Sequence, residues 1–146
     1  MEVLRLHFRP DDEWLGELTL GVTLGDFTGV GTAWFSKETL REFADALMAF
    51  PLSAEQPPSI SGGNGGNDTV PAQEQVSIKF EPHNILGAVR ATVHVETDFW
   101  DGRERGLTKE ATMRFLVTYG DLGRFAPAIL DLLDGRAIEA VLTTTP

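Results

Sequence analysis

The chain contains no cysteine among its 146 residues. This absence excludes disulfide bonds, thiolate metal ligands and a cysteine nucleophile. The chain also has no run of about 18 apolar residues, which a membrane-spanning helix requires, and its first residues, MEVLRLHFRP, lack the apolar centre of a signal peptide. We therefore expect a cytoplasmic protein that folds as one domain over residues 1–146, a length sufficient to bury a core without cross-links.

Basic residues are scarce, with 12 Lys and Arg against 22 Asp and Glu, which gives a net charge of −10. An acidic surface repels the phosphate groups of nucleic acids and anionic lipids, so we expect neither a nucleic-acid partner nor a membrane partner. The same charge attracts basic proteins and speeds their encounter. A purely solubilising role of the charge is the alternative.

The clearest periodic pattern lies in residues 36–50, SKETLREFADALMAF. Its apolar residues recur at the three- and four-residue spacing of a helix with one buried face. Ser36 stands where an N-cap accepts a free backbone N–H group, and Pro51 ends the pattern. We therefore predict a helix from Lys37 to Phe50.

A similar order of apolar residues returns near the end of the chain, at Leu122, Phe125, Ala126, Ala128 and Ile129. Thr118 and Asp121 form an N-terminal capping pattern before it. Gly123 and Pro127 lie inside it, and an interior proline removes a hydrogen bond and clashes with the preceding turn. We expect a kinked helix, or a short first turn followed by a helix over about residues 125–134.

Alternation of apolar and polar residues predicts six strands, at residues 4–8, 18–24, 27–35, 76–82, 91–97 and 111–117. Gly25 and Asp26 fit a two-residue hairpin turn, because glycine tolerates positive φ. Three strands followed by a helix thus occur twice, in residues 1–50 and 76–135. The pattern predicts an α+β fold with a mostly antiparallel sheet of about six strands and both helices on one face.

The composition between the two units changes to Gly, Pro, Ser, Asn and Gln, with SGGNGGND at the centre of residues 51–75. Such a segment buries too little apolar area to offset the entropy of ordering it, so we expect a flexible linker or long loop. Its glycine pairs do not form a phosphate-binding loop, since the flanking strand, the Lys-Ser/Thr pair and the helix are missing. The tail, residues 136–146, could form either a short strand or a short helix.

Catalytic signals are few. His94, Glu96 and Asp98 alternate along a predicted strand, so their side chains share one face at a spacing that could hold a metal or an acid–base pair. A solvated polar strand face is the simpler explanation. There is no G-x-S-x-G motif for a nucleophilic serine. No residue is therefore assigned a catalytic, cofactor-binding or metal-binding role, and no cofactor is expected.

Aromatic residues are the best candidates for a protein interface. Phe99 and Trp100 lie at a predicted hairpin tip between Asp98 and Asp101, and Trp34 is out of phase with its inward-facing neighbours. Large aromatic residues dominate the binding energy of interfaces. The alternative is that Phe99 and Trp100 fold back onto the sheet edge, since exposed aromatic groups are costly without a partner. Trp14 admits the same two interpretations as Trp34.

The chain resembles a group of small bacterial proteins that includes the WapI-like immunity proteins. The resemblance rests on GDFTG at residues 25–29, on the helix and following residues LREFADALMAFPL at 40–52, and on the second L-x-x-F-A helix at 122–126. It implies a non-enzymatic protein that binds and neutralises a toxin domain, often one that acts on nucleic acid. It supplies no catalytic residues.

Three functions are therefore compared. The first is a non-catalytic binding protein, of the immunity type, whose partner is a basic toxin domain. The second is a structural or adaptor protein that forms a homodimer or larger assembly through a sheet edge or Trp100. The third is a small metal-dependent hydrolase that uses the face carrying His94, Glu96 and Asp98.

Overall fold

The computed structural model of the chain describes residues 1–63, 74–97 and 108–144. In chain order its elements are β1 (Glu2–Pro10), β2 (Leu15–Leu24), β3 (Phe27–Ser36), α1 (Lys37–Ala46), β4 (Ser59–Gly62), β5 (Val76–Pro82), β6 (Val89–Glu96), β7 (Glu110–Val117), α2 (Tyr119–Leu133) and β8 (Ala140–Thr143). Within the described ranges, neither helix has the length and apolar character needed to cross a membrane.

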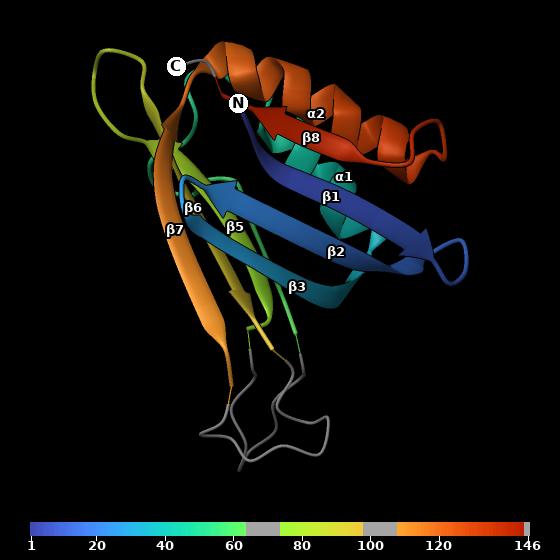
Figure 1. Cartoon of the computed structure of the whole chain (residues 1–146). Coiled ribbons are helices and arrows are strands. Elements are labelled where there is room, and N and C mark those ends of the chain that lie inside the picture. Colours follow the sequence, from blue (N-terminus) through green and yellow to red (C-terminus); the bar gives the residue numbers. More distant parts are fainter. Residues whose placement is uncertain (64–73, 98–107, 145–146) are drawn as a thin grey trace.

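The strands form two antiparallel sheets of four strands each (Figure 1). The order is β3-β2-β1-β8 in the first sheet and β4-β5-β6-β7 in the second. The α+β class with antiparallel strands is confirmed, whereas the prediction of one sheet with about six strands is wrong. The additional strands, β4 and β8, have four residues each, which is too short for an alternating pattern to reveal them.

The two halves of the chain do not form two separate copies of one unit. Three strands and a helix do follow one another in each half, but β4 precedes the second set and β8 follows it. β8 pairs with β1, where Leu142 lies opposite Leu4. The end of the chain therefore completes the first sheet, and the two halves are joined through shared strand pairing.

Part of the predicted linker, residues 51–75, is built into the core. Leu52 and Ile60 are buried, and the Leu52 N–H donates a hydrogen bond to the hydroxyl of Tyr119 at 3.1 Å. Ile60 belongs to β4, which pairs with β5. These partners lie far along the chain, so the composition of the segment could not indicate them. The expectation of a flexible linker is wrong for these residues.

The first helix begins where the sequence predicts and ends earlier. The Thr39 N–H donates to Ser36 Oγ at 3.0 Å, which confirms Ser36 as the N-cap. α1 ends at Ala46 rather than at Phe50. The Met48 N–H bonds to a carbonyl three residues back, so the chain leaves the α-helix through a tighter turn.

The second helix is continuous from Tyr119 to Leu133, with Pro127 inside it. Thr118 and Asp121 form the predicted capping box, in which each side chain accepts from the backbone N–H of the other. The expectation of a helix that starts near residue 125 is wrong. Buried side chains lie on both sides of the proline, so packing holds both parts in place; they are Leu122, Phe125, Ala126, Ile129, Leu132 and Leu133.

The two sheets meet along β3, which contacts all four strands of the second sheet. A Cβ atom on Gly31 would lie 2.8 Å from the carbonyl oxygen of Gln75, and one on Gly29 would lie 2.7 Å from a methyl group of Val95. Real Cβ atoms do not approach other atoms so closely. The absence of a side chain at these two positions is therefore what lets the sheets come together.

The helices cover the inner faces of the sheets (Figure 1). α2 packs along β8 and β1, and α1 packs against β3, β4 and α2. The ring of Phe80, from β5, lies 6.1 Å from that of Phe43 in α1 and 6.4 Å from that of Phe125 in α2. All three are buried. The core thus lies between the sheets, and the outer face of each sheet remains for function.

Candidate functional site

The outer face of the second sheet carries mostly polar side chains, in rows across β5, β6 and β7. The rows are Glu81–Arg90–Leu116, Lys79–Thr92–Arg114, Ser77–His94–Thr112 and Glu96–Glu110. Glu81 accepts a hydrogen bond from Arg90 at 2.7 Å, which holds the pKa of the Glu81 carboxyl below its usual value. The charges are thus paired at one end of this face, while two carboxylates lie opposite each other at the other end.

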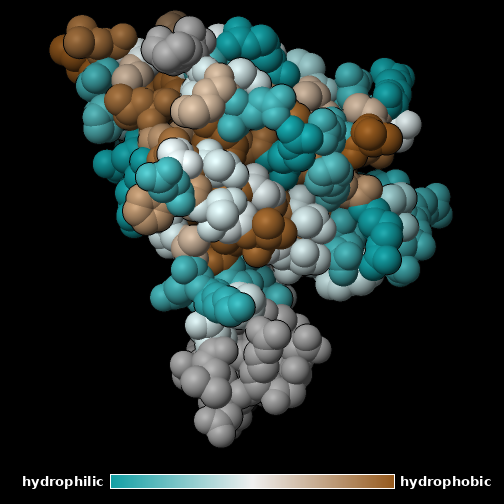
Figure 2. Space-filling model, in the orientation of Figure 1, coloured by the Kyte–Doolittle hydropathy of each residue, from teal (hydrophilic) through white to brown (hydrophobic). Residues whose placement is uncertain are grey.

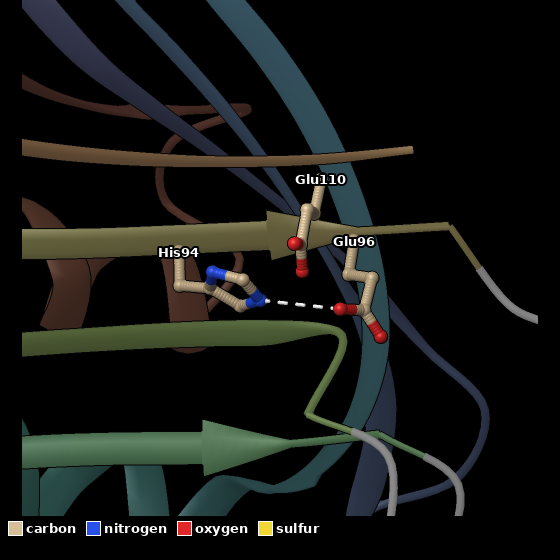
Figure 3. Close-up of side chains that lie close together, drawn as sticks. All are labelled: His94, Glu96 and Glu110. Atoms are coloured by element: carbon tan, nitrogen blue, oxygen red, sulfur yellow. Dashed lines mark ion pairs between the residues drawn. The ribbon is translucent and has the colours of Figure 1, made fainter. Parts of the chain in front are cut away.

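The second end of this face holds a cluster of His94, Glu96 and Glu110 (Figure 3). One imidazole nitrogen of His94 and one carboxylate oxygen from each glutamate all lie within 4.8 Å of one another. His94 Nε2 is 3.6 Å from Glu96 Oε1, and His94 Nδ1 is hydrogen-bonded to Thr112 Oγ1 at 2.7 Å. We call these three residues the HEE cluster.

The alternation of residues along β6 predicts two members of the HEE cluster but not the third. His94 and Glu96 share a face of β6, as their alternation predicts. Asp98, the third residue of the predicted pattern, lies outside the described residues. Glu110 comes from β7 and lies directly opposite Glu96. Glu110 alternates with the inward-facing residues of β7, which indicates that its side chain faces outward. Its proximity to Glu96 follows only from the register between β6 and β7.

Trp34 is the predicted interface residue that the structure describes. Its side chain is 53% exposed on the outer face of the first sheet, while the neighbouring Ala33 and Phe35 are buried. The outward position of Trp34 agrees with the sequence pattern, in which Trp34 is out of phase with its inward-facing neighbours. The remaining candidates, Asp98, Phe99, Trp100 and Asp101, lie outside the described residues.

Trp34 and two other exposed apolar residues, Trp14 and Leu15, lie at the same end of the β2–β3 ladder. Trp14 is 70% exposed and Leu15 is 44% exposed. In the β2–β3 ladder, Trp34 lies opposite Glu17. Leu15 is two residues before Glu17 and is on the same face of β2. Leu15 and Trp34 are therefore diagonal neighbours across the two strands. Trp14 directly precedes Leu15, and its carbonyl accepts the N–H of Lys37 at 2.8 Å. We call Trp14, Leu15 and Trp34 the tryptophan surface.

The turn that carries Trp14 is fixed by an aspartate. Asp12 Oδ1 accepts the N–H groups of Trp14 at 2.7 Å and of Leu15 at 2.8 Å. These bonds hold the pKa of the Asp12 carboxyl below its usual value, so the carboxylate is ionised and the turn is intact at neutral pH. Trp14 is therefore presented by a preorganised turn.

Exposed carboxylates lie next to the tryptophan surface along the chain. Asp11 and Glu13 lie in the same turn as Asp12, and Glu38 lies in the first turn of α1; all are exposed and form no ion pair with another described residue. Glu17, beside Trp34, accepts a hydrogen bond from Arg9 at 3.2 Å. The surface thus combines large apolar groups with negative charge.

A second exposed apolar site lies at the connection between β5 and β6, where Ile85 and Leu86 are almost fully exposed. The Asn84 side chain accepts the N–H groups of Leu86 and Ala88 and shapes this turn. Figure 2 shows hydrophobic side chains gathered at the upper left corner, where Figure 1 places the β5–β6 connection. This site contains no aromatic residue.

Comparison with protein-family models, with curated proteins and with solved structures gives no significant match. The resemblance to the WapI-like immunity proteins is therefore still an expectation from the sequence.

Proposed function

We propose that this protein is a non-catalytic binding protein of the immunity type, which binds a basic protein domain through the tryptophan surface. The proposal rests on the exposure of Trp14, Leu15 and Trp34 at one end of the β2–β3 ladder, with Asp11, Glu13 and Glu38 close to them in the chain. Tryptophan is among the residues that contribute most to binding energy at interfaces. Apolar groups of this size are rarely exposed together without a function.

The charge of the surface favours a basic partner. Asp11, Glu13 and Glu38 contribute negative charge next to the two tryptophans in the chain. Arg9 is held by Glu17, and Lys37 is close enough to Asp12 to lower the pKa of that carboxyl further, beyond the effect of its backbone hydrogen bonds. The chain as a whole carries a net charge of −10. A partner rich in Lys and Arg would be attracted over a distance of about 10 Å at 0.1 M salt and would then dock on the aromatic groups. A basic toxin domain that acts on nucleic acid has this chemistry.

The experiment is affinity capture of the tagged protein from its native cells at low and at high salt, with mass spectrometry of the retained proteins. We expect one basic protein that is retained at low salt and released at high salt. Recovery of an acidic or neutral partner at both salt concentrations would contradict the proposal. Recovery of the protein alone, as a dimer by light scattering, would favour the self-associating alternative.

Replacing Trp14 and Trp34 together by alanine is expected to weaken binding of the captured partner at least about 30-fold, since one hot-spot residue contributes about 2 kcal/mol or more. Isothermal titration calorimetry measures this change. The matched control is Phe27→Ala, because Phe27 is 73% exposed at the opposite end of β3 from Trp34. The control should bind within about twofold of the unmodified protein; equal losses in both variants would place the interface elsewhere.

A further inference from the structure

We propose that the HEE cluster binds a divalent transition-metal ion such as Zn²⁺, with His94, Glu96 and Glu110 as its protein ligands. The sequence alone assigns no metal ligand, because the third donor comes from another strand. The cluster lies on the outer face of the second sheet, whereas the tryptophan surface lies on the first. The proposal is therefore independent of the proposed binding function.

The spacing of the donor atoms suits one ion. Zinc binds histidine nitrogen and carboxylate oxygen at about 2.0–2.2 Å, so two donors of a tetrahedral ion lie roughly 3.3–3.6 Å apart. His94 Nε2 and Glu96 Oε1 are already 3.6 Å apart. One carboxylate oxygen of Glu110 lies within 4.8 Å of a donor atom of each of the other two residues, and rotation of its exposed side chain would bring it closer.

Thr112 holds His94 in an orientation that suits metal binding. It lies opposite His94 in the β6–β7 ladder and is hydrogen-bonded to Nδ1 at 2.7 Å. When Nδ1–H donates to the threonine oxygen, the lone pair of Nε2 points to the two carboxylates, as Figure 3 shows for the ring. A hydrogen bond to the other ring nitrogen is a general feature of histidine ligands.

The two glutamates place two carboxylates close together in the cluster. Glu96 and Glu110 lie directly opposite each other on neighbouring strands, and like charges in such a pair destabilise a sheet. The side chains of His94 and Glu96 are each only 17% exposed, so water screens this repulsion less than at an open surface. A divalent cation bound by both carboxylates would be attracted by each of them and would link β6 to β7.

The donor set selects the class of ion. Imidazole nitrogen favours zinc, copper, iron and nickel, while sites for Mg²⁺ and Ca²⁺ use oxygen donors almost exclusively. One nitrogen and two carboxylate oxygens therefore favour a transition ion over Mg²⁺. Three protein ligands also leave a position for water, which is what the metal-dependent hydrolase considered from the sequence would require.

The test is calorimetric titration of the untagged full-length protein with ZnCl₂, together with thermal unfolding with and without zinc. We expect one Zn²⁺ per chain and a higher Tm when zinc is present, because a ligand that binds only the folded state stabilises it. MgCl₂ at the same concentration should give neither effect. Absence of zinc binding, or equal binding of Mg²⁺, would overturn the proposal.

Variants locate the site. His94→Ala and Glu110→Gln should each lower zinc affinity at least 10-fold, and Thr112→Val should lower it about 10- to 100-fold while Thr112→Ser retains it. The control is His7→Ala, since His7 lies on the first sheet, where one carboxylate of the described residues, that of Glu139, lies 3.7 Å away. Zinc binding that survives His94→Ala, or that is lost in His7→Ala, would overturn the assignment. The zinc-dependent rise in Tm should disappear with the affinity.

Discussion

Replacing Phe80 by alanine is expected to lower the free energy of unfolding by about 3–5 kcal/mol, the usual cost of removing a buried phenylalanine. Phe80 is fully buried in β5. Its ring stacks near Phe43 of α1 and meets Phe125 of α2 edge-on. The substitution therefore leaves a cavity where the second sheet contacts both helices, and rigid neighbours on three elements limit how far the site can collapse.

Urea denaturation followed by circular dichroism measures this loss. Phe27→Ala is again the matched control, because Phe27 is largely exposed and surface substitutions usually change stability by less than about 0.5 kcal/mol. A loss below about 1 kcal/mol for Phe80→Ala would mean that the second sheet and the helices do not share one core.

Replacing Gly31 by valine is expected to destabilise the protein by about 1–3 kcal/mol or more, the range for overpacking a well-packed site. A Cβ atom on Gly31 would lie 2.8 Å from the backbone oxygen of Gln75 and 3.0 Å from Val95 Cβ. Neither atom belongs to the flexible end of a side chain, so relief of the clash requires movement of β3 relative to the second sheet.

Gly21→Val is the matched control for this substitution. Gly21 lies opposite Val30 in the same sheet, but an added Cβ would meet only the Arg5 carbonyl oxygen, at 4.0 Å. Valine favours strands, so we expect Gly21→Val to change stability by less than about 0.5 kcal/mol. Equal effects of the two substitutions in urea denaturation would contradict the close contact between the sheets along β3.

Local patterns in the sequence predict most of the strands and both helices. The alternation around Leu18, Leu20 and Val22 identifies β2, and the Ser36 cap identifies the start of α1, because these signals depend on neighbouring residues. β4 and β8 could not be predicted in this way. Ile60 and Leu142 are buried through pairing with β5 and β1, and pairing between distant segments leaves no periodic signal in a strand of four residues.

The candidate sites differ in how far sequence could predict them. Trp34 could be placed on the outer face from its phase, and His94 and Glu96 from their alternation. Glu110 could not be joined to them, because its position opposite Glu96 is fixed by the β6–β7 register. Trp14 could be recognised as a candidate, but its presentation depends on the hydrogen bonds from the turn to Asp12.

The measurement that tests the proposed function most directly is amide hydrogen exchange of the protein alone and in complex with its captured partner. We expect slower exchange on binding in residues 11–17 and 34–38, which carry the tryptophan surface and its carboxylates, and unchanged exchange in residues 83–88, which carry Ile85 and Leu86. Protection confined to residues 83–88, with residues 11–17 and 34–38 unchanged, would contradict the assignment of the tryptophan surface as the binding site.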